Sequence, residues 1–149
     1  MKGISLPAET KKTPVEAQDF ALLKHARALA LSPDGSQLAI TLARCDLDQK
    51  KYFADIHVLD TRTNYVRQWT RGDHADRAPV WSPDGTRLAF LRNDKGLDRI
   101  FIISRDGGEA EEVFKAWGSF SQVQWAGDST LVVKFRKSDS TSEIEKAIA

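Results

Sequence analysis

The sequence is poor in the residues that stabilise small domains by covalent or metal cross-links. Cys45 is its only cysteine, which excludes an internal disulfide and a zinc site built from cysteines. No apolar run approaches the roughly 20 residues needed to span a bilayer, and the first residues lack the continuous apolar core of a signal peptide. We therefore expect a cytoplasmic protein with no membrane partner.

An excess of charge of one sign is also lacking. The chain carries 22 basic and 21 acidic residues, interspersed along its length, for a formal net charge of +1. This near-balance gives no basic surface of the kind that binds nucleic acid, so no nucleic-acid partner is expected. A hydrophobic content of 41% and a charged content of 29% are close to globular averages and indicate a folded chain.

A repeated hairpin motif is the strongest pattern that is present. Residues 30–40 read Ala-Leu-Ser-Pro-Asp-Gly-Ser-Gln-Leu-Ala-Ile, and residues 80–90 repeat them as Val-Trp-Ser-Pro-Asp-Gly-Thr-Arg-Leu-Ala-Phe. A degraded third copy, residues 124–133, has lost the proline and is one residue shorter. Ser-Pro suits a type I turn, and the glycine can take the left-handed conformation that closes a hairpin. We interpret eight residues as structural hairpin residues: Ser32, Pro33, Asp34, Gly35, Ser82, Pro83, Asp84 and Gly85.

The spacing of the repeat is that of a propeller blade. Ile56 and Ile100 are 44 residues apart, as are Trp81 and Trp125, and a period near 44 with several short strands is typical of blades. The first unit is six residues longer, and the extra residues fall in a connection between positions 42 and 55. Leu31, Trp81 and Trp125 occupy equivalent positions of the repeat, so we expect all three in the blade core.

The sequence therefore predicts an all-β fold: a partial β-propeller with two full four-stranded blades, half of a third, and a short N-terminal helix. Thr13, Pro14 and Glu16 match a helix-capping pattern. The expected organisation is a flexible N-terminus over 1–12, a helix and lead-in over 13–27, blade 1 over 28–76, blade 2 over 77–117, and a partial blade 3 with a polar tail over 118–149. Strands are expected at 28–32, 37–42, 55–60, 66–70, 78–82, 87–92, 99–104, 110–114, 122–126 and 130–135.

These hairpins resemble the WD40-like repeats shared by TolB-type propellers and by prolyl-oligopeptidase-family (S9) serine peptidases. Residues 41–58, which include Asp46, Leu47, Tyr52 and the run Asp-Ile-His-Val, are similar to a segment near the start of acylaminoacyl-peptidase-like members. His57 stands where that family often has an aromatic residue. The resemblance implies a propeller that precedes a C-terminal α/β-hydrolase domain and admits only short or unstructured peptides.

No catalytic residue is carried over from that family. Its nucleophile sits in a Gly-x-Ser-x-Gly turn, and none of the 149 residues forms that motif. His25, His57 and His74 are scattered, so we expect no catalytic, metal-binding or cofactor-binding residue and no cofactor. Asp34 and Asp84 are interpreted as turn residues rather than acid–base groups. Residues 71–77, Arg-Gly-Asp-His-Ala-Asp-Arg, are interpreted as a solvated connection, with a charge network as the alternative.

Two functions remain open at this point. The first is a non-catalytic N-terminal segment of an acylaminoacyl-peptidase-like serine peptidase, gating peptide access to a hydrolase domain. The second is an independent TolB-like or WD40-like protein-binding module, and a decayed remnant is a third possibility. Two and a half blades cannot close a propeller, so the expected partners are the missing blades and hydrolase domain, or other copies that associate through the open blade faces.

Overall fold

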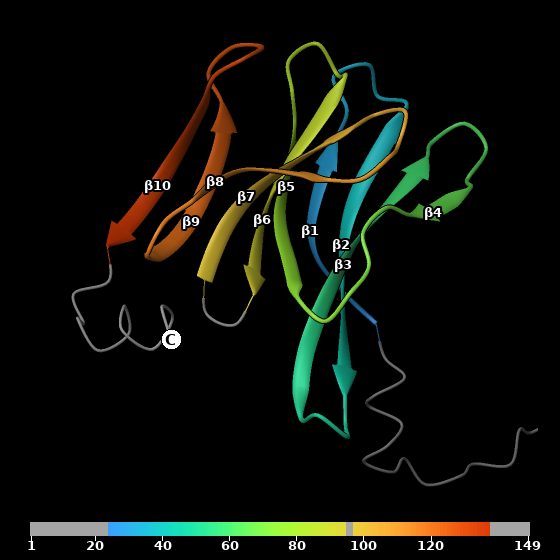
Figure 1. Cartoon of the computed structure of the whole chain (residues 1–149). Coiled ribbons are helices and arrows are strands. Elements are labelled where there is room, and N and C mark those ends of the chain that lie inside the picture. Colours follow the sequence, from blue (N-terminus) through green and yellow to red (C-terminus); the bar gives the residue numbers. More distant parts are fainter. Residues whose placement is uncertain (1–23, 95–96, 138–149) are drawn as a thin grey trace, which may run out of the picture.

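The computed structural model describes residues 24–94 and 97–137 of the chain. Every regular element in these ranges is a β-strand, so the predicted all-β class is confirmed there. The helix predicted to begin at Thr13 lies outside the described residues. Figure 1 shows the strands fanned out as successive antiparallel sheets.

The strands group into two four-stranded blades and a two-stranded third. Blade 1 comprises β1 (His25–Leu31), β2 (Gln37–Asp46), β3 (Lys51–Asp60) and β4 (Val66–Gln68). Blade 2 comprises β5 (Ala75–Trp81), β6 (Arg87–Asp94), β7 (Leu97–Ser104) and β8 (Glu111–Lys115). The third blade comprises β9 (Gly118–Trp125) and β10 (Leu131–Lys137). Each blade is antiparallel, and a single parallel bridge, Ala54 to Ala75, joins blade 1 to blade 2.

The six extra residues of the first unit lengthen a hairpin. β2 and β3 pair without interruption from Gln37 and Asp60 to Asp46 and Lys51. The amide of Gln49 donates to Asp46 Oδ1 at 2.9 Å and holds the tip. The extra residues fall between positions 42 and 55 as expected, but the strands predicted at 37–42 and 55–60 are too short, because continuing the ladder satisfies backbone groups that would otherwise need other partners. The hairpin extends beyond its neighbours in Figure 1.

Apolar side chains fill the joints between blades. Phe90 and Phe101 stack with their ring centroids 5.7 Å apart at the joint of blades 1 and 2. The buried members of that joint are Ala39, Ile56, Val58, Trp81, Leu88, Phe90, Phe101 and Ile103. A smaller cluster joins blade 2 to the third blade and comprises Leu91, Ile100, Phe120 and Val123. The core therefore lies between the sheets, as expected for stacked blades.

Leu31 does not belong to the blade core, so that prediction is wrong. Its side chain is 58% exposed, whereas the equivalent Trp81 is 6% exposed. Leu31 pairs with Leu38 on the face of blade 1 that points away from blade 2. Trp81 lies on the equivalent face of blade 2, which blade 1 covers. No described strand covers the outer face of blade 1, and Trp125 is half-buried against blade 2.

Candidate functional site

Local hydrogen bonds occupy the hairpin aspartates. Asp34 Oδ1 accepts from the Ser32 hydroxyl at 2.6 Å, and Asp84 Oδ1 accepts from the Ser82 hydroxyl at 2.5 Å and the Thr86 amide at 3.0 Å. The Ser32 hydroxyl holds the pKa of Asp34 well below its usual range, and the Ser82 hydroxyl lowers the pKa of Asp84 to about 2. A carboxyl with a lowered pKa stays ionised near neutral pH and has no proton to donate there, so these two aspartates are better interpreted as turn residues than as general acids.

Arg105 connects the hairpin of blade 1 to blade 2. Its Nη2 donates to Asp34 Oδ2 at 2.8 Å and to the Ser36 hydroxyl at 2.5 Å. Its Nη1 donates to the carbonyl of Gly85 at 3.3 Å. One guanidinium therefore binds the hairpin turns of two successive blades.

A buried charge network lies at the start of β5, at the end of the blades opposite the hairpin turns. Asp76 is 0% exposed and accepts two hydrogen bonds from Arg92, at 2.7 and 2.9 Å. The Arg92 guanidinium lies 4.4 Å from the ring centroid of Phe101, so it is both paired and stacked. His74 Nε2 lies 3.9 Å from Asp76 Oδ2. The interpretation of residues 71–77 as a solvated connection is therefore wrong for Asp76, although Arg71 is exposed.

Asp98 anchors the third blade to blade 2. Its Oδ2 accepts from Arg77 Nη2 at 2.6 Å and from the Phe120 amide at 2.8 Å, while its Oδ1 accepts from Asn93 Nδ2 at 2.7 Å. Arg77 also donates to the Phe120 carbonyl at 2.9 Å. Both backbone groups of Phe120 are thus held by one ion pair from the preceding blade.

The buried carboxylate of Asp55 has fewer hydrogen-bond partners than those of Asp76 and Asp98. Its Oδ2 lies 3.5 Å from Arg44 Nε, and its buried Oδ1 has no hydrogen-bond partner among the described residues. Burial raises the pKa of Asp55, and the neighbouring Arg44 partly offsets this effect. Burial also lowers the pKa of His57. Asp55 is therefore a buried acid whose ionised form is poorly compensated.

The described residues contain no group of three or more His, Cys, Asp or Glu side chains arranged to hold a metal ion. The described part of the chain also contains no helix long and apolar enough to cross a membrane. His25 lies on the exposed β1, His57 in β3 and His74 before β5, so the structure does not assemble the histidines into one site.

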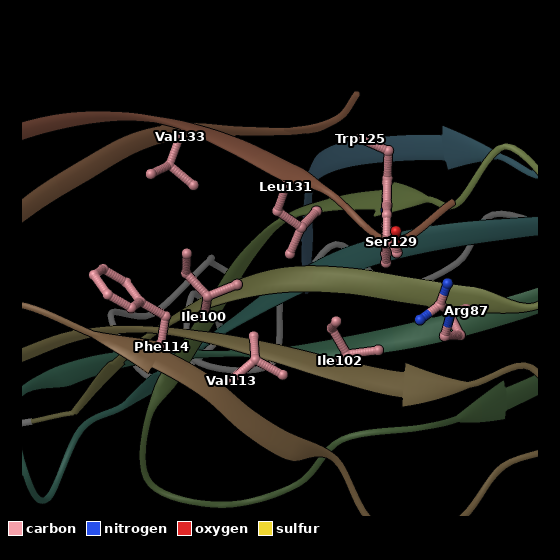
Figure 2. A pocket seen from close by; sticks show the side chains of 9 residues that line it. All are labelled: Arg87, Ile100, Ile102, Val113, Phe114, Trp125, Ser129, Leu131 and Val133. Carbon is pink, nitrogen blue, oxygen red and sulfur yellow. The ribbon is translucent and has the colours of Figure 1, made fainter. Parts of the chain in front are cut away.

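An open groove of about 400 Å³ lies between blade 2 and the third blade. Figure 2 shows Trp125, Leu131 and Val133 on one side and Ile100 and Ile102 on the other. The remaining lining residues are Arg87, Val113, Phe114 and Ser129. The groove is mainly apolar and lies beside β10, whose second edge is unpaired among the described strands.

The repeated blades, their shared hairpins and the half-blade all agree with a known family. The family described as "TolB beta propeller domain" matches residues 13–148. The chain belongs to this TolB propeller family. Among curated relatives, this TolB-type propeller is 29% identical over 139 residues to "Uncharacterized peptidase YuxL" of Bacillus subtilis, covering 91% of the chain and 21% of the relative. It is 36% identical over 84 residues to "Lasso peptide isopeptidase AtxE2" of Asticcacaulis excentricus, covering 55% of the chain and 12% of the relative.

A solved structure supports the same fold. An acylaminoacyl peptidase in complex with Z-Gly-Gly-Phe-chloromethyl ketone superposes with a TM-score of 0.67 and 21% identity, over 79% of this chain and 18% of that one. The predicted partial propeller and the predicted relationship to S9-family peptidases are therefore confirmed. The TolB-type propeller described here spans about one fifth or less of the length of these relatives.

Sequence reasoning missed the residues that connect the blades. Asp98 and Arg77 lie 21 residues apart, and Arg105 meets Asp34 across 71 residues. The one available signal was Asp98 itself, the only acidic residue of β7, which lies just before the apolar run 100–103. An acid at such a position needs a partner, which a sequence pattern alone does not name.

Proposed function

We propose that this chain is the non-catalytic propeller segment of an acylaminoacyl-peptidase-like serine peptidase and restricts the entry of peptides to a C-terminal α/β-hydrolase domain. The observation that carries the proposal is the identity of 29% to a peptidase over 91% of the chain. The proposed partners are the remaining blades and the hydrolase domain, and the proposed substrates of the whole protein are peptides.

The contacts between blades support a gating role. Arg105 links two hairpin turns at one end of the blades, and the Arg77–Asp98 pair holds Phe120 at the other. The Ala54–Ala75 bridge also joins blades 1 and 2 at the end opposite Arg105. Because these two blades are bound at both ends, a route between them stays narrow. A narrow route admits an extended peptide and excludes a folded protein.

The gating proposal is tested on the full-length polypeptide with a series of substrates of increasing length. We expect kcat/KM to fall steeply for long substrates. Asp98→Ala, which loosens the joint between blade 2 and the third blade, should raise the cleavage of long substrates relative to short ones. Gln122→Ala, at an exposed position of β9, is the matched control. An unchanged length preference in a folded Asp98→Ala enzyme contradicts gating by this segment.

The absence of catalysis is tested on the chain alone. We expect no hydrolysis of peptide or acyl-amino-acid reporters, because the proposed nucleophile belongs to the hydrolase domain. Turnover that co-purifies with this chain and scales with its concentration overturns this part of the proposal.

An independent TolB-like binding module is the second candidate, favoured by the description of the matching family. The coding sequence downstream of Ala149 distinguishes the two candidates. Further blades and a Gly-x-Ser-x-Gly motif support the peptidase segment. A stop codon followed by an unrelated gene supports the binding module.

A further inference from the structure

Three turns of the chain share the sequence pattern Ser-x-Asp-Gly. They span residues 32–35, 82–85 and 104–107, and no other Asp-Gly pair occurs in the 149 residues. In each turn the glycine amide donates to the carbonyl of the serine three residues earlier, at 2.8, 2.8 and 3.0 Å. Each glycine also has a positive φ, between 69° and 96°. The main chains of the three turns are therefore alike, and the turns differ in how their side chains are held.

The aspartate of the third turn is held differently from the other two. In the first two turns the serine hydroxyl donates to the aspartate Oδ1, at 2.6 and 2.5 Å. In the third turn the Ser104 hydroxyl instead accepts a hydrogen bond from the Asp106 amide, at 3.3 Å. Asp106 is exposed, and no described residue hydrogen-bonds to its carboxylate or forms an ion pair with it. Its carboxyl group therefore rotates without breaking a contact, unlike those of Asp34 and Asp84.

An aspartate that precedes glycine can react with its own main chain. The glycine amide nitrogen attacks the aspartate Cγ, so that a C–N bond forms and a carboxyl C–O bond breaks. The carboxyl hydroxyl and the amide proton leave as water, and a succinimide ring remains. Water then reopens the ring: attack at Cγ restores aspartate, whereas attack at the main-chain carbonyl carbon leaves isoaspartate and lengthens the main chain by one methylene. Glycine favours this reaction because it has no side chain to obstruct the ring.

The turn contacts protect Asp34 and Asp84 from this reaction. The reaction requires a protonated carboxyl, because an ionised carboxylate has no oxygen that leaves readily. The Ser82 hydroxyl lowers the pKa of Asp84 from 3.8 to about 2, so at neutral pH Asp84 is protonated about 60-fold less often than an aspartate of ordinary pKa. The Ser32 hydroxyl likewise lowers the pKa of Asp34. The third turn lacks a contact of this kind within the described part of the chain.

We propose that the unheld carboxyl of Asp106 lets its peptide bond to Gly107 isomerise spontaneously to isoaspartate, and that this change loosens the link that Arg105 makes between blades 1 and 2. The Arg105 amide donates to the carbonyl of Thr86 at 2.8 Å, and its guanidinium binds Asp34 Oδ2 at 2.8 Å. An added methylene directly after Arg105 lengthens the turn that positions both groups. The isomerisation is independent of the proposed function, because it needs only the turn itself and water.

The test compares the three turns within one sample of the full chain, aged in neutral buffer. Isoaspartyl methyltransferase labels isoaspartate after digestion, and fragmentation mass spectrometry assigns each labelled site. We expect isoaspartate to form at Asp106 at least about 10-fold faster than at Asp34 or Asp84. Amide hydrogen exchange of the isomerised fraction should be faster at Arg105, whose hydrogen bond to Thr86 is disturbed. Equal rates at the three turns, or an unchanged exchange rate at Arg105, overturn the proposal.

Two controls separate the effect of the structure from that of the sequence. In guanidinium chloride the turn contacts are lost, so the three sites should react at similar rates. A preference for Asp106 that persists in the unfolded chain shows that the turn contacts do not cause it and overturns the proposal. Asp106→Glu keeps the negative charge but requires a larger ring, so it should abolish labelling at this position and hold the exchange rate at Arg105 constant with age. Ser82→Ala removes the contact that protects Asp84 and should raise its rate in the folded chain toward that of Asp106.

Discussion

Trp81 donates its indole Nε1–H to the carbonyl of Ala30 at 3.0 Å, across the joint between blades 1 and 2. Trp125 makes the same contact one blade later, to the carbonyl of Val80 at 3.1 Å. In both cases the acceptor is the residue just before the repeat-equivalent position of the preceding blade. The tryptophan of the repeat therefore forms a hydrogen bond to the preceding blade. The third unit keeps this hydrogen bond although its hairpin has lost the proline.

We predict that Trp81→Phe lowers the free energy of unfolding by about 1–2 kcal/mol, because it removes this hydrogen bond and changes the edge-to-face contact with Trp69. Urea denaturation measures the change. Trp125→Phe is the matched variant and should cost less, because Trp125 is only half-buried. Equal losses for the two variants would show that the contact with Trp69 and the deeper burial contribute nothing.

The hairpin aspartates predict a loss of stability in acid. The folded pKa of Asp84 is lowered from 3.8 to about 2 by the Ser82 hydroxyl, so its contribution is fully present above pH 3.8. That contribution is lost as the pH falls through about 2. Asp84→Asn should therefore flatten the acid limb of a stability profile measured by chemical denaturation. A profile of unchanged shape in this variant contradicts the assignment.

The sequence predicted the blades well because their signals are local. The Ser-Pro-Asp-Gly turns set where β1 ends and β2 begins, and the 44-residue period placed β7 and β9. The same periodicity misplaced Leu31, because position in the repeat does not say whether a neighbouring blade is present.

The site-forming contacts could not be predicted in the same way. Asp76 belongs to a stretch of alternating charges that has the composition of a loop, yet it is buried against Arg92. The groove brings Ile100 and Ile102 of blade 2 opposite Leu131 and Val133 of the third blade, which follow about 30 residues later in the chain. Such contacts arise from the stacking of blades, which a single sequence shows only as a repeat.

The Asp98 anchor predicts a local loosening of the third blade. Asp98→Ala removes one partner of a buried ion pair and leaves the Phe120 amide unpaired, which should cost about 3–5 kcal/mol. Asp98→Asn keeps an oxygen acceptor and should cost less. Hydrogen exchange should show faster exchange in β9 and β10 than in β6 for the alanine variant. Uniform loss of protection in all blades would contradict an anchor specific to this joint.

We expect the contribution of Asp55 to stability to change with pH in the opposite direction to that of Asp84. Burial raises the folded pKa of Asp55 above 3.8, so the stability it contributes is fully present below that pH. It is lost as the pH rises through the folded pKa, when a charge forms whose Oδ1 has no partner. Asp55→Asn removes this titration and should gain stability relative to the unmodified chain between pH 3 and pH 7.

Thermal or urea unfolding at the two pH values measures this gain. Asp73→Asn is the control, because that side chain is 69% exposed and lies 3.7 Å from the same arginine, Arg44. If Asp55→Asn is less stable by the same amount at both pH values, the polar shape of the carboxyl matters and its charge does not. If the loss grows toward pH 7, the ion pair with Arg44 outweighs burial, because only the ionised carboxylate can form it.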